Sequence, residues 1–183
     1  KCVKYASNNG HLEIVKYLVD EYKAVISDYS VQYASKNGHL DVVKYLVEEC
    51  NAVISDYSVL WASSNGHLDI VKYLVKNNAV ISDESVACAS SSGHLDIVKF
   101  LVEECKAVIS DNSILQASNN GHLEVVKYLV EECKAVIYDD SVQCALRTGH
   151  LDIVKYLVEE CNAKISIFGK IQLVIYNVFG IVV

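Results

Sequence analysis

Apolar and polar residues recur with helical spacing around residue 40 of this 183-residue chain. The apolar positions follow an i, i+3, i+6, i+7 pattern, which predicts one buried stripe on an amphipathic helix: Leu40, Val43, Leu46 and Val47. Asp41, Lys44 and Glu48 fall on the opposite side, where charged side chains stay in water. The pattern therefore predicts a helix that packs with one face only.

A shorter helix is predicted immediately before this one. Ser27-Asp28 supplies an N-cap candidate, and Val31 and Ala34 are expected to face inward. Gly38 follows its last turn, where a residue in the left-handed conformation commonly ends a helix. Asn51 suits the same role after the second helix. The segment thus predicts a helix–turn–helix unit.

The unit returns along the chain in a motif, Gly-His-Leu-Asp/Glu-Ile/Val-Val-Lys-Tyr/Phe-Leu-Val, that occurs six times. Its histidines stand 28, 28, 27, 28 and 28 residues apart: His11, His39, His67, His94, His122 and His150. A period in this range predicts a solenoid, in which each unit buries its apolar face against its neighbours. The predicted units are 1–26 (truncated), 27–54, 55–81, 82–109, 110–137 and 138–164, followed by a tail at 165–183.

The run from Ala34 to Val47 resembles the end of the first helix, the tight turn and the second helix of an ankyrin repeat. The same match begins at five further alanines: Ala6, Ala62, Ala89, Ala117 and Ala145. Together the matches cover roughly residues 1 to 164. The resemblance implies an all-α, ankyrin-like α-solenoid of helix–turn–helix repeats.

Two departures from the family pattern limit what the resemblance implies. Where the family usually has Thr-Pro-Leu-His, this chain has Tyr29-Ser30-Val31-Gln32 and similar runs. The unit is also shorter than the family's ~33 residues, and only Val53–Asp56 links Ala52 to Tyr57, so much-shortened hairpin loops are expected. Such trimmed repeats resemble the arrays of large DNA viruses of protists and of their hosts.

Composition and charge favour a folded, soluble array. The chain is 52% hydrophobic, with a net charge of −7 and a pI of about 5.3. Proteins that bind nucleic acid carry a basic stripe, so no nucleic acid is expected, and a protein partner with a basic surface is favoured. The lack of a signal peptide predicts a cytoplasmic location, in the host cytoplasm if the protein is viral. Because the chain has no Met and opens at Lys1 within a predicted helix, we expect a piece of a longer protein.

Seven cysteines and six histidines raise the question of a metal or disulfide site. Four cysteines share one repeat position: Cys50, Cys105, Cys133 and Cys161. Equivalent positions on stacked helices lie about 8–10 Å apart, which is too far for a disulfide or a shared zinc ion. We therefore expect free thiols, no metal and no cofactor. The resemblance implies that the histidines support the turns through hydrogen bonds, with pH sensing as the alternative.

No catalytic constellation is found in the sequence, which lacks a Gly-rich phosphate loop, a nucleophile elbow and a His-Glu-x-x-His run. Acidic pairs repeat near the end of the second helix and are interpreted as a solvated face: Glu48-Glu49, Glu103-Glu104, Glu131-Glu132 and Glu159-Glu160. The sequence thus predicts neither catalytic residues nor a small-molecule substrate.

The positions that vary most between repeats lie on the first helix. In ankyrin proteins the residues just before Gly-His line the concave binding surface, so the resemblance implies a partner-binding groove. In the first three repeats its residues are Tyr5, Asn8, Asn9, Tyr29, Tyr33, Lys36, Asn37, Tyr57, Trp61, Ser64 and Asn65. Tyrosine and tryptophan are frequent binding anchors because they bury a large area with few rotatable bonds. Tyr33 and Trp61 stand where the family has a packing leucine, so a mainly structural role is the alternative for both.

The tail reads ISIFGKIQLVIYNVFGIVV and breaks the repeat pattern. It is interpreted as a degenerate terminal repeat folded onto the sixth, with an aberrant sequence or membrane association as alternatives. A membrane-spanning helix is disfavoured because Lys170, Gln172 and Asn177 interrupt the apolar run.

The sequence therefore predicts a non-catalytic protein–protein interaction scaffold that binds a partner protein along the first-helix groove. The alternative is a passive structural spacer within a longer polypeptide, with no partner of its own. The exposure of Tyr29, Tyr57 and Trp61 distinguishes the two, because a contiguous open aromatic patch favours binding whereas buried rings favour a spacer.

Overall fold

The computed structural model describes residues 2–164, 166 and 169–170, and all regular structure within them is helical. The first helices of the repeats are α1 (Cys2–Asn8), α3 (Asp28–Lys36), α5 (Asp56–Ser64), α7 (Asp83–Ser91), α9 (Asp111–Asn119) and α11 (Asp139–Thr148). The second helices are α2 (Leu12–Asp20), α4 (Leu40–Glu48), α6 (Leu68–Lys76), α8 (Leu95–Lys99), α10 (Leu123–Glu131) and α12 (Leu151–Lys155). α8 and α12 continue into π-helical turns, η1 (Phe100–Glu104) and η2 (Tyr156–Glu160). The repeat boundaries given above stay a prediction.

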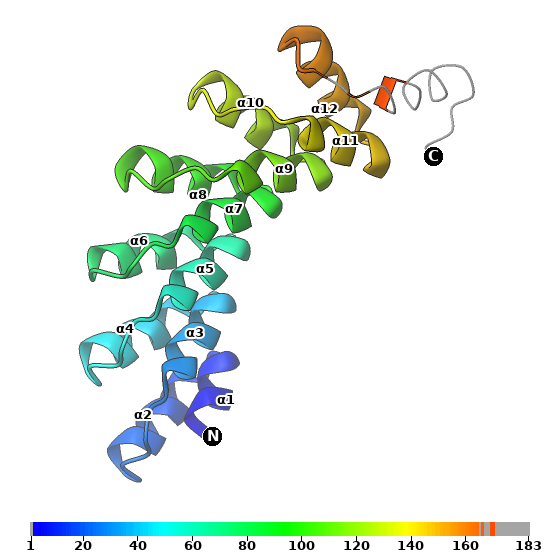
Figure 1. The fold of residues 1–183 in the computed structure, drawn as a ribbon. Coiled ribbons are helices and arrows are strands. Elements are labelled where there is room, and N and C mark those ends of the chain that lie inside the picture. The colour runs from blue at the N-terminus through cyan, green and yellow to red at the C-terminus, as the bar shows by residue number, and fades with distance from the viewer. Residues whose placement is uncertain (1, 165, 167–168, 171–183) are drawn as a thin grey trace. The chain divides into compact units, whose positions relative to one another are not determined.

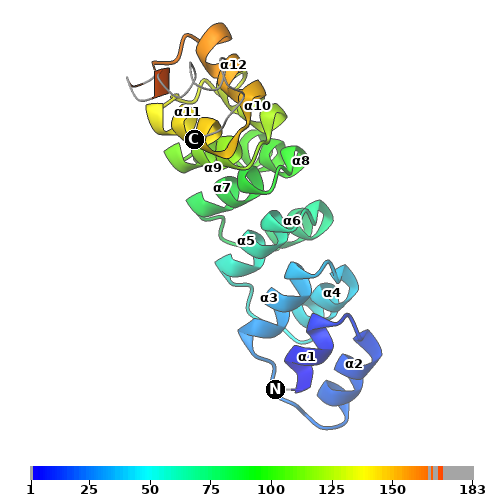
Figure 2. The same ribbon diagram turned by 90° about the vertical axis from the view of Figure 1, so that its right-hand side faces the viewer.

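The chain forms two compact units, Lys1–Ser85 and Val86–Val183. In the first unit, α1, α3 and α5 lie side by side in one layer, and α2, α4 and α6 form a second layer beside it (Figures 1 and 2). In the described part of the second unit, α9 packs against α11, and α10 contacts both α8 and α12. Each unit is therefore a stack of helix pairs.

The buried stripe of the second helices differs from the predicted one. In α4 the fully buried residues are Val42, Val43 and Leu46, whereas Leu40 and Val47 are only half-buried. The same three positions are buried in α6 and α10: Ile70, Val71, Leu74, Val125, Val126 and Leu129. Each second helix in a stack contacts the first helix of the same repeat and the second helices of both neighbouring repeats. Its buried face is therefore rotated from the one expected for packing against a single helix.

The ends of the helices largely follow the prediction. Gly38 adopts φ +80°, and the His39 amide bonds back to the Ala34 carbonyl at 3.0 Å, which closes the first helix of this repeat. Asn51 is also left-handed, at φ 51°. Ser27 occupies the N-cap position in an extended conformation, as predicted, although its side chain makes no capping hydrogen bond.

Three residues of the tail are described, and one of them continues the pattern of the repeats. The Gln143 side-chain amide donates to the Ser166 hydroxyl at 2.9 Å, as the Gln32 amide donates to the Ser55 hydroxyl at 2.9 Å. Both contacts join residues 23 positions apart. Apart from Ser166, Gly169 and Lys170, the tail and its interpretations lie outside the described residues. Of the helices that the structure does describe, none has the length and apolarity to cross a membrane.

Candidate protein-binding surface

The first helices α3 and α5 each have a buried face and an aromatic face. Val31 and Ala34 of α3 are fully buried, so Tyr29 and Tyr33, one turn apart on the other side, point away from the core. α5 repeats the arrangement, with Val59 and Ala62 buried. Tyr57 and Trp61 therefore continue the aromatic row of α3 onto the next helix.

These side chains meet in one hollow of about 450 Å³, which we call the aromatic hollow. Its lining residues are Asp28, Tyr29, Gln32, Tyr33, Lys36, Tyr57 and Trp61. All of them belong to α3 or α5, two helices that lie side by side within the first unit. The hollow is thus built entirely from neighbouring first helices.

The rings of the hollow are open to solvent to different degrees. Tyr29 is 58% exposed and Tyr57 55%, whereas Trp61 is 37% exposed and Tyr33 is half-buried. The exposed rings form one contiguous aromatic surface because they share the hollow. Tyr33 and Trp61 are therefore less open to solvent than Tyr29 and Tyr57.

Two lysines lie over the rings of this surface. The Lys36 ammonium lies 4.7 Å from the ring centre of Trp61, and the Lys4 ammonium lies 4.7 Å from that of Tyr33. Lys4 also lies 5.7 Å from the ring of Tyr29. Each lysine reaches from one first helix to an aromatic ring of the next. These cation–π contacts hold the lysine side chains across the rings.

The histidines of the motif connect successive repeats. The Nε2 atom of His67 lies 3.1 Å from the Lys36 carbonyl oxygen, and that of His39 lies 3.1 Å from the Asn8 carbonyl oxygen. His122 makes the same contact with Ser91 at 3.0 Å. For these three histidines the predicted hydrogen-bonding role is confirmed, and the bond ties the imidazole to the first helix of the preceding repeat.

A family model for ankyrin repeats matches residues 3–85, 33–113 and 85–168, which together take in most of the chain. The chain belongs to the ankyrin repeat family. The predicted all-α, ankyrin-like fold class is confirmed, and ankyrin repeats generally mediate protein–protein interactions and are typically non-enzymatic.

A solved structure supports the fold of this ankyrin repeat protein. The crystal structure of the human ASB11 ankyrin repeat domain is similar to it with a TM-score of 0.71 and 19% identity, over 90% of this chain and 85% of that one. At this identity the similarity shows the fold alone. No curated protein matches the sequence.

The structure brings together only part of the binding surface predicted for this ankyrin repeat protein. Tyr29, Tyr33, Lys36, Tyr57 and Trp61 line the aromatic hollow. Six predicted residues do not line it: Tyr5, Asn8, Asn9, Asn37, Ser64 and Asn65.

Three of those six residues have a role at the helix ends. The side-chain amides of Asn9, Asn37 and Asn65 each donate to the backbone carbonyl four residues earlier, at 2.8, 3.0 and 2.8 Å. Each of these carbonyls also accepts the backbone N–H of the same asparagine, so the side-chain amide adds a second hydrogen bond at the end of the helix. The asparagine amides thus stabilise the first helices where they end.

Sequence reasoning missed three residues at the hollow. Asp28 and Gln32 line it together with Lys36, at the i, i+4, i+8 positions of α3. This spacing places all three on one helix face, so the periodicity of the sequence could have identified them. Lys4 lies over Tyr33 from the adjacent α1, and only the packing of α1 beside α3 reveals this contact.

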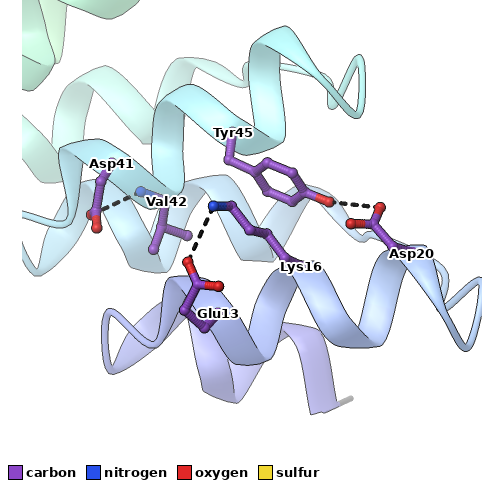
Figure 3. A network of polar contacts seen from close by, with 6 residues as sticks. All are labelled: Glu13, Lys16, Asp20, Asp41, Val42 and Tyr45. Carbon is purple, nitrogen blue, oxygen red and sulfur yellow. Dashed lines mark hydrogen bonds and ion pairs between the residues drawn. The ribbon is translucent and has the colours of Figure 1, made fainter.

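The outer face of the second helices contains a series of tyrosine–carboxylate pairs. The Tyr45 hydroxyl donates to Asp20 at 3.1 Å, beside an ion pair of Lys16 with Glu13 at 3.1 Å (Figure 3). Tyr73 donates to Glu48 in the same way at 2.9 Å. Further pairs join Tyr128 to Glu103 and Tyr156 to Glu131, both at 2.9 Å. The acidic residues predicted as a solvated face are exposed, and three of them, Glu48, Glu103 and Glu131, also bind a tyrosine of the following repeat.

The environment of these tyrosines changes their ionisation. Burial, together with the hydrogen bond to Glu48, raises the pKa of Tyr73 to about 12. Burial is also the largest cause that raises the pKa of Tyr45, Tyr128 and Tyr156, followed in each by hydrogen bonds with a cysteine and with the paired carboxylate. A buried phenol beside a carboxylate resists losing its proton, because the product would be a second negative charge at the same place.

None of the seven cysteines, all of which the structure describes, forms a disulfide, and Cys2 is the exposed one among them. Burial raises the pKa of the Cys50, Cys105 and Cys133 thiols. Among the described residues, no group of three or more His, Cys, Asp and Glu side chains is arranged to hold a metal ion.

Proposed function

We propose that this protein is a non-catalytic interaction scaffold that binds a partner protein along its first helices, with the aromatic hollow of residues 1–85 as the centre of the binding surface. One observation carries the proposal. Tyr29, Tyr57 and Trp61 are exposed and line a single hollow, which is the arrangement expected of binding anchors. In a passive spacer, selection for solubility would favour polar residues at these positions.

The later repeats support this placement. At the position of Tyr29 and Tyr57, the fifth repeat has Asn112 and the sixth has Asp140. The framework therefore tolerates polar residues there, and the tyrosines of the earlier repeats are not required by the stack. We also propose a cytoplasmic location, supported by cysteine spacing that does not fit a disulfide framework.

A pull-down from lysate of the native cell tests the proposal. The wild-type chain is compared with a triple variant, Tyr29→Ala, Tyr57→Ala and Trp61→Ala, after circular dichroism has shown that both are folded. We expect a protein that the wild type retains and the triple variant loses.

A matched control removes three exposed aromatic rings elsewhere: Tyr17→Ala, Tyr22→Ala and Tyr138→Ala. These tyrosines are 57%, 67% and 45% exposed and do not line the hollow. The control variant should retain the partner. If the folded wild type retains nothing specific, or if both variants bind equally well, the interaction surface is not the aromatic hollow and the spacer becomes the better interpretation.

A further inference from the structure

We propose that the aromatic hollow recognises an acidic peptide segment of the partner, in which a carboxylate side chain stands next to an apolar one. The carboxylate would lie beside the Lys36 ammonium group, with Lys4 adding positive charge from the adjacent α1, and the apolar side chain would pack on the rings of Tyr57 and Trp61. This inference rests on the proposed function and specifies the chemistry of the partner.

The two lysines provide the charge complementarity. Both ammonium groups lie over aromatic rings, at 4.7 Å from Tyr33 and from Trp61, and neither forms an ion pair with a described carboxylate. A ring face attracts the ammonium group but does not neutralise its charge. Lys4 and Lys36 thus keep a full positive charge over an apolar floor, which is where a carboxylate gains most from pairing.

Other polar groups of the hollow can donate hydrogen bonds to a ligand. Trp61 has an indole N–H that can only donate, and Tyr29 and Tyr57 each have a hydroxyl that can donate. The Gln32 amide nitrogen already donates to Ser55, at 2.9 Å. A carboxylate suits the free donors, because it provides several lone pairs in one group.

Asp28 is the one carboxylate that lines the hollow, and it sits at the other end of α3 from Lys36. Eight residues of helix separate the two by about 12 Å along the axis. Of the residues that line the hollow, Lys36 carries the positive charge and lies farthest along α3 from Asp28, so the carboxylate of the ligand is expected at Lys36. A basic residue of the same segment would suit the Asp28 end.

A basic segment fits the hollow less well, although the net charge of −7 by itself favoured a basic partner. At the Lys36 end of the hollow, its cation would have to displace Lys36 from the ring of Trp61 or lie next to an ammonium group of the same sign. Like charges placed together at an interface act against the wrong partner. The charges at the hollow therefore favour an acidic segment, whereas the net charge of the whole chain favoured a basic partner.

Selection from a random peptide library displayed on phage tests the proposal with the full chain. The wild-type protein is expected to enrich peptides in which Asp or Glu stands beside an aromatic or aliphatic residue. The affinity of the best synthetic peptide should fall about tenfold or more in the double variant Lys4→Glu, Lys36→Glu, since two charge-assisted contacts become repulsive. Its affinity should also fall as salt is raised.

A second double variant, Lys16→Glu and Lys44→Glu, changes the net charge equally but on the second helices, and should bind the peptide within about twofold of wild type. Equal affinity of the acidic peptide for the wild type and the Lys4→Glu, Lys36→Glu variant overturns the inference.

Two further outcomes separate this inference from the proposed function. Enrichment of basic or neutral peptides whose binding is lost in Trp61→Ala overturns the acidic chemistry and leaves the aromatic hollow as the binding surface. No enrichment by folded wild-type protein counts against both the inference and the proposed function.

Discussion

The imidazole of His67 occupies the space that a side chain at Gly38 would need. A β-carbon on Gly38 would lie 2.7 Å from Cε1 of His67, well inside normal contact distance. The same glycine has φ +80°, and His67 bonds to the Lys36 carbonyl beside it. Gly38 therefore has two functions, since it ends its own helix and makes room for the histidine of the next repeat.

Replacing Gly38 with alanine should lower the free energy of unfolding by about 2–3 kcal/mol. The left-handed conformation alone costs an alanine roughly 1–2 kcal/mol, and the displacement of the His67 ring adds to it. Urea unfolding followed by circular dichroism measures the change.

A double-mutant cycle separates the two costs. In a His67→Ala background the ring is gone, and Gly38→Ala should cost only the conformational part. An equal cost in both backgrounds would show that the close approach of the two residues is energetically irrelevant.

The Tyr73–Glu48 pair predicts a loss of stability at alkaline pH. The pKa of Tyr73 is raised to about 12 from its ordinary value of 10.0, so folding favours the protonated phenol. Its contribution is fully present below pH 10.0 and is lost as the pH rises through about 12.

Tyr73→Phe isolates this contribution from the other groups that titrate in the same range. At pH 9 the variant should be less stable than the wild type by roughly 1 kcal/mol or less, because the phenol is only partly buried and Glu48 is exposed. This difference should shrink as the pH approaches 12, as measured by urea unfolding at several pH values. A constant difference from pH 9 to 12 would mean that Tyr73 titrates normally. The aromatic ring itself is tolerated, since Phe100 holds the equivalent position in the fourth repeat.

Val42 and Val47 give a matched test of which face of α4 packs in the core. Val42 is fully buried and Val47 is half-buried. Val42→Ala should cost about 2 kcal/mol, from the lost burial of two carbon atoms and the cavity that they leave. Val47→Ala should cost about half of that or less. A larger loss of stability for Val47→Ala than for Val42→Ala in thermal or urea unfolding would favour the stripe predicted from the sequence.

The cysteines should differ in their reactivity in the folded protein. Cys2 is exposed, whereas burial raises the pKa of Cys50, Cys105 and Cys133 and so reduces the fraction of reactive thiolate. We expect iodoacetamide to label Cys2 first and the other three several-fold more slowly, as followed by mass spectrometry of peptides. Labelling in urea provides the control, because there the rates should become similar. Fast labelling of Cys50 in the folded state would contradict its placement.

The period of the sequence determined most of the fold. Six copies of one motif predicted the helix pairs, Gly38 marked the turn, and Val31 and Ala34 were correctly placed in the core. These features depend on residues close together in the chain, where helical spacing and backbone conformation act directly.

Contacts between repeats were decided only by the tertiary structure. The buried arc of α4 includes Val42 instead of Leu40 because the neighbouring second helices complete its environment. The phenol of Tyr73 reaches Glu48 across 25 residues of sequence, a distance over which helical periodicity carries no information.

The aromatic hollow also depends partly on the sequence alone and partly on the tertiary structure. The sequence by itself determined that Tyr29 and Tyr33 share one face of a helix, since residues one turn apart must lie together. Only the stacking of α1, α3 and α5 places Lys4 over Tyr33 and Lys36 over Trp61, and so brings two ammonium groups to the aromatic rings. A side chain's neighbours on its own helix follow from the spacing of the sequence, whereas its neighbours on the next helix depend on how the two helices pack.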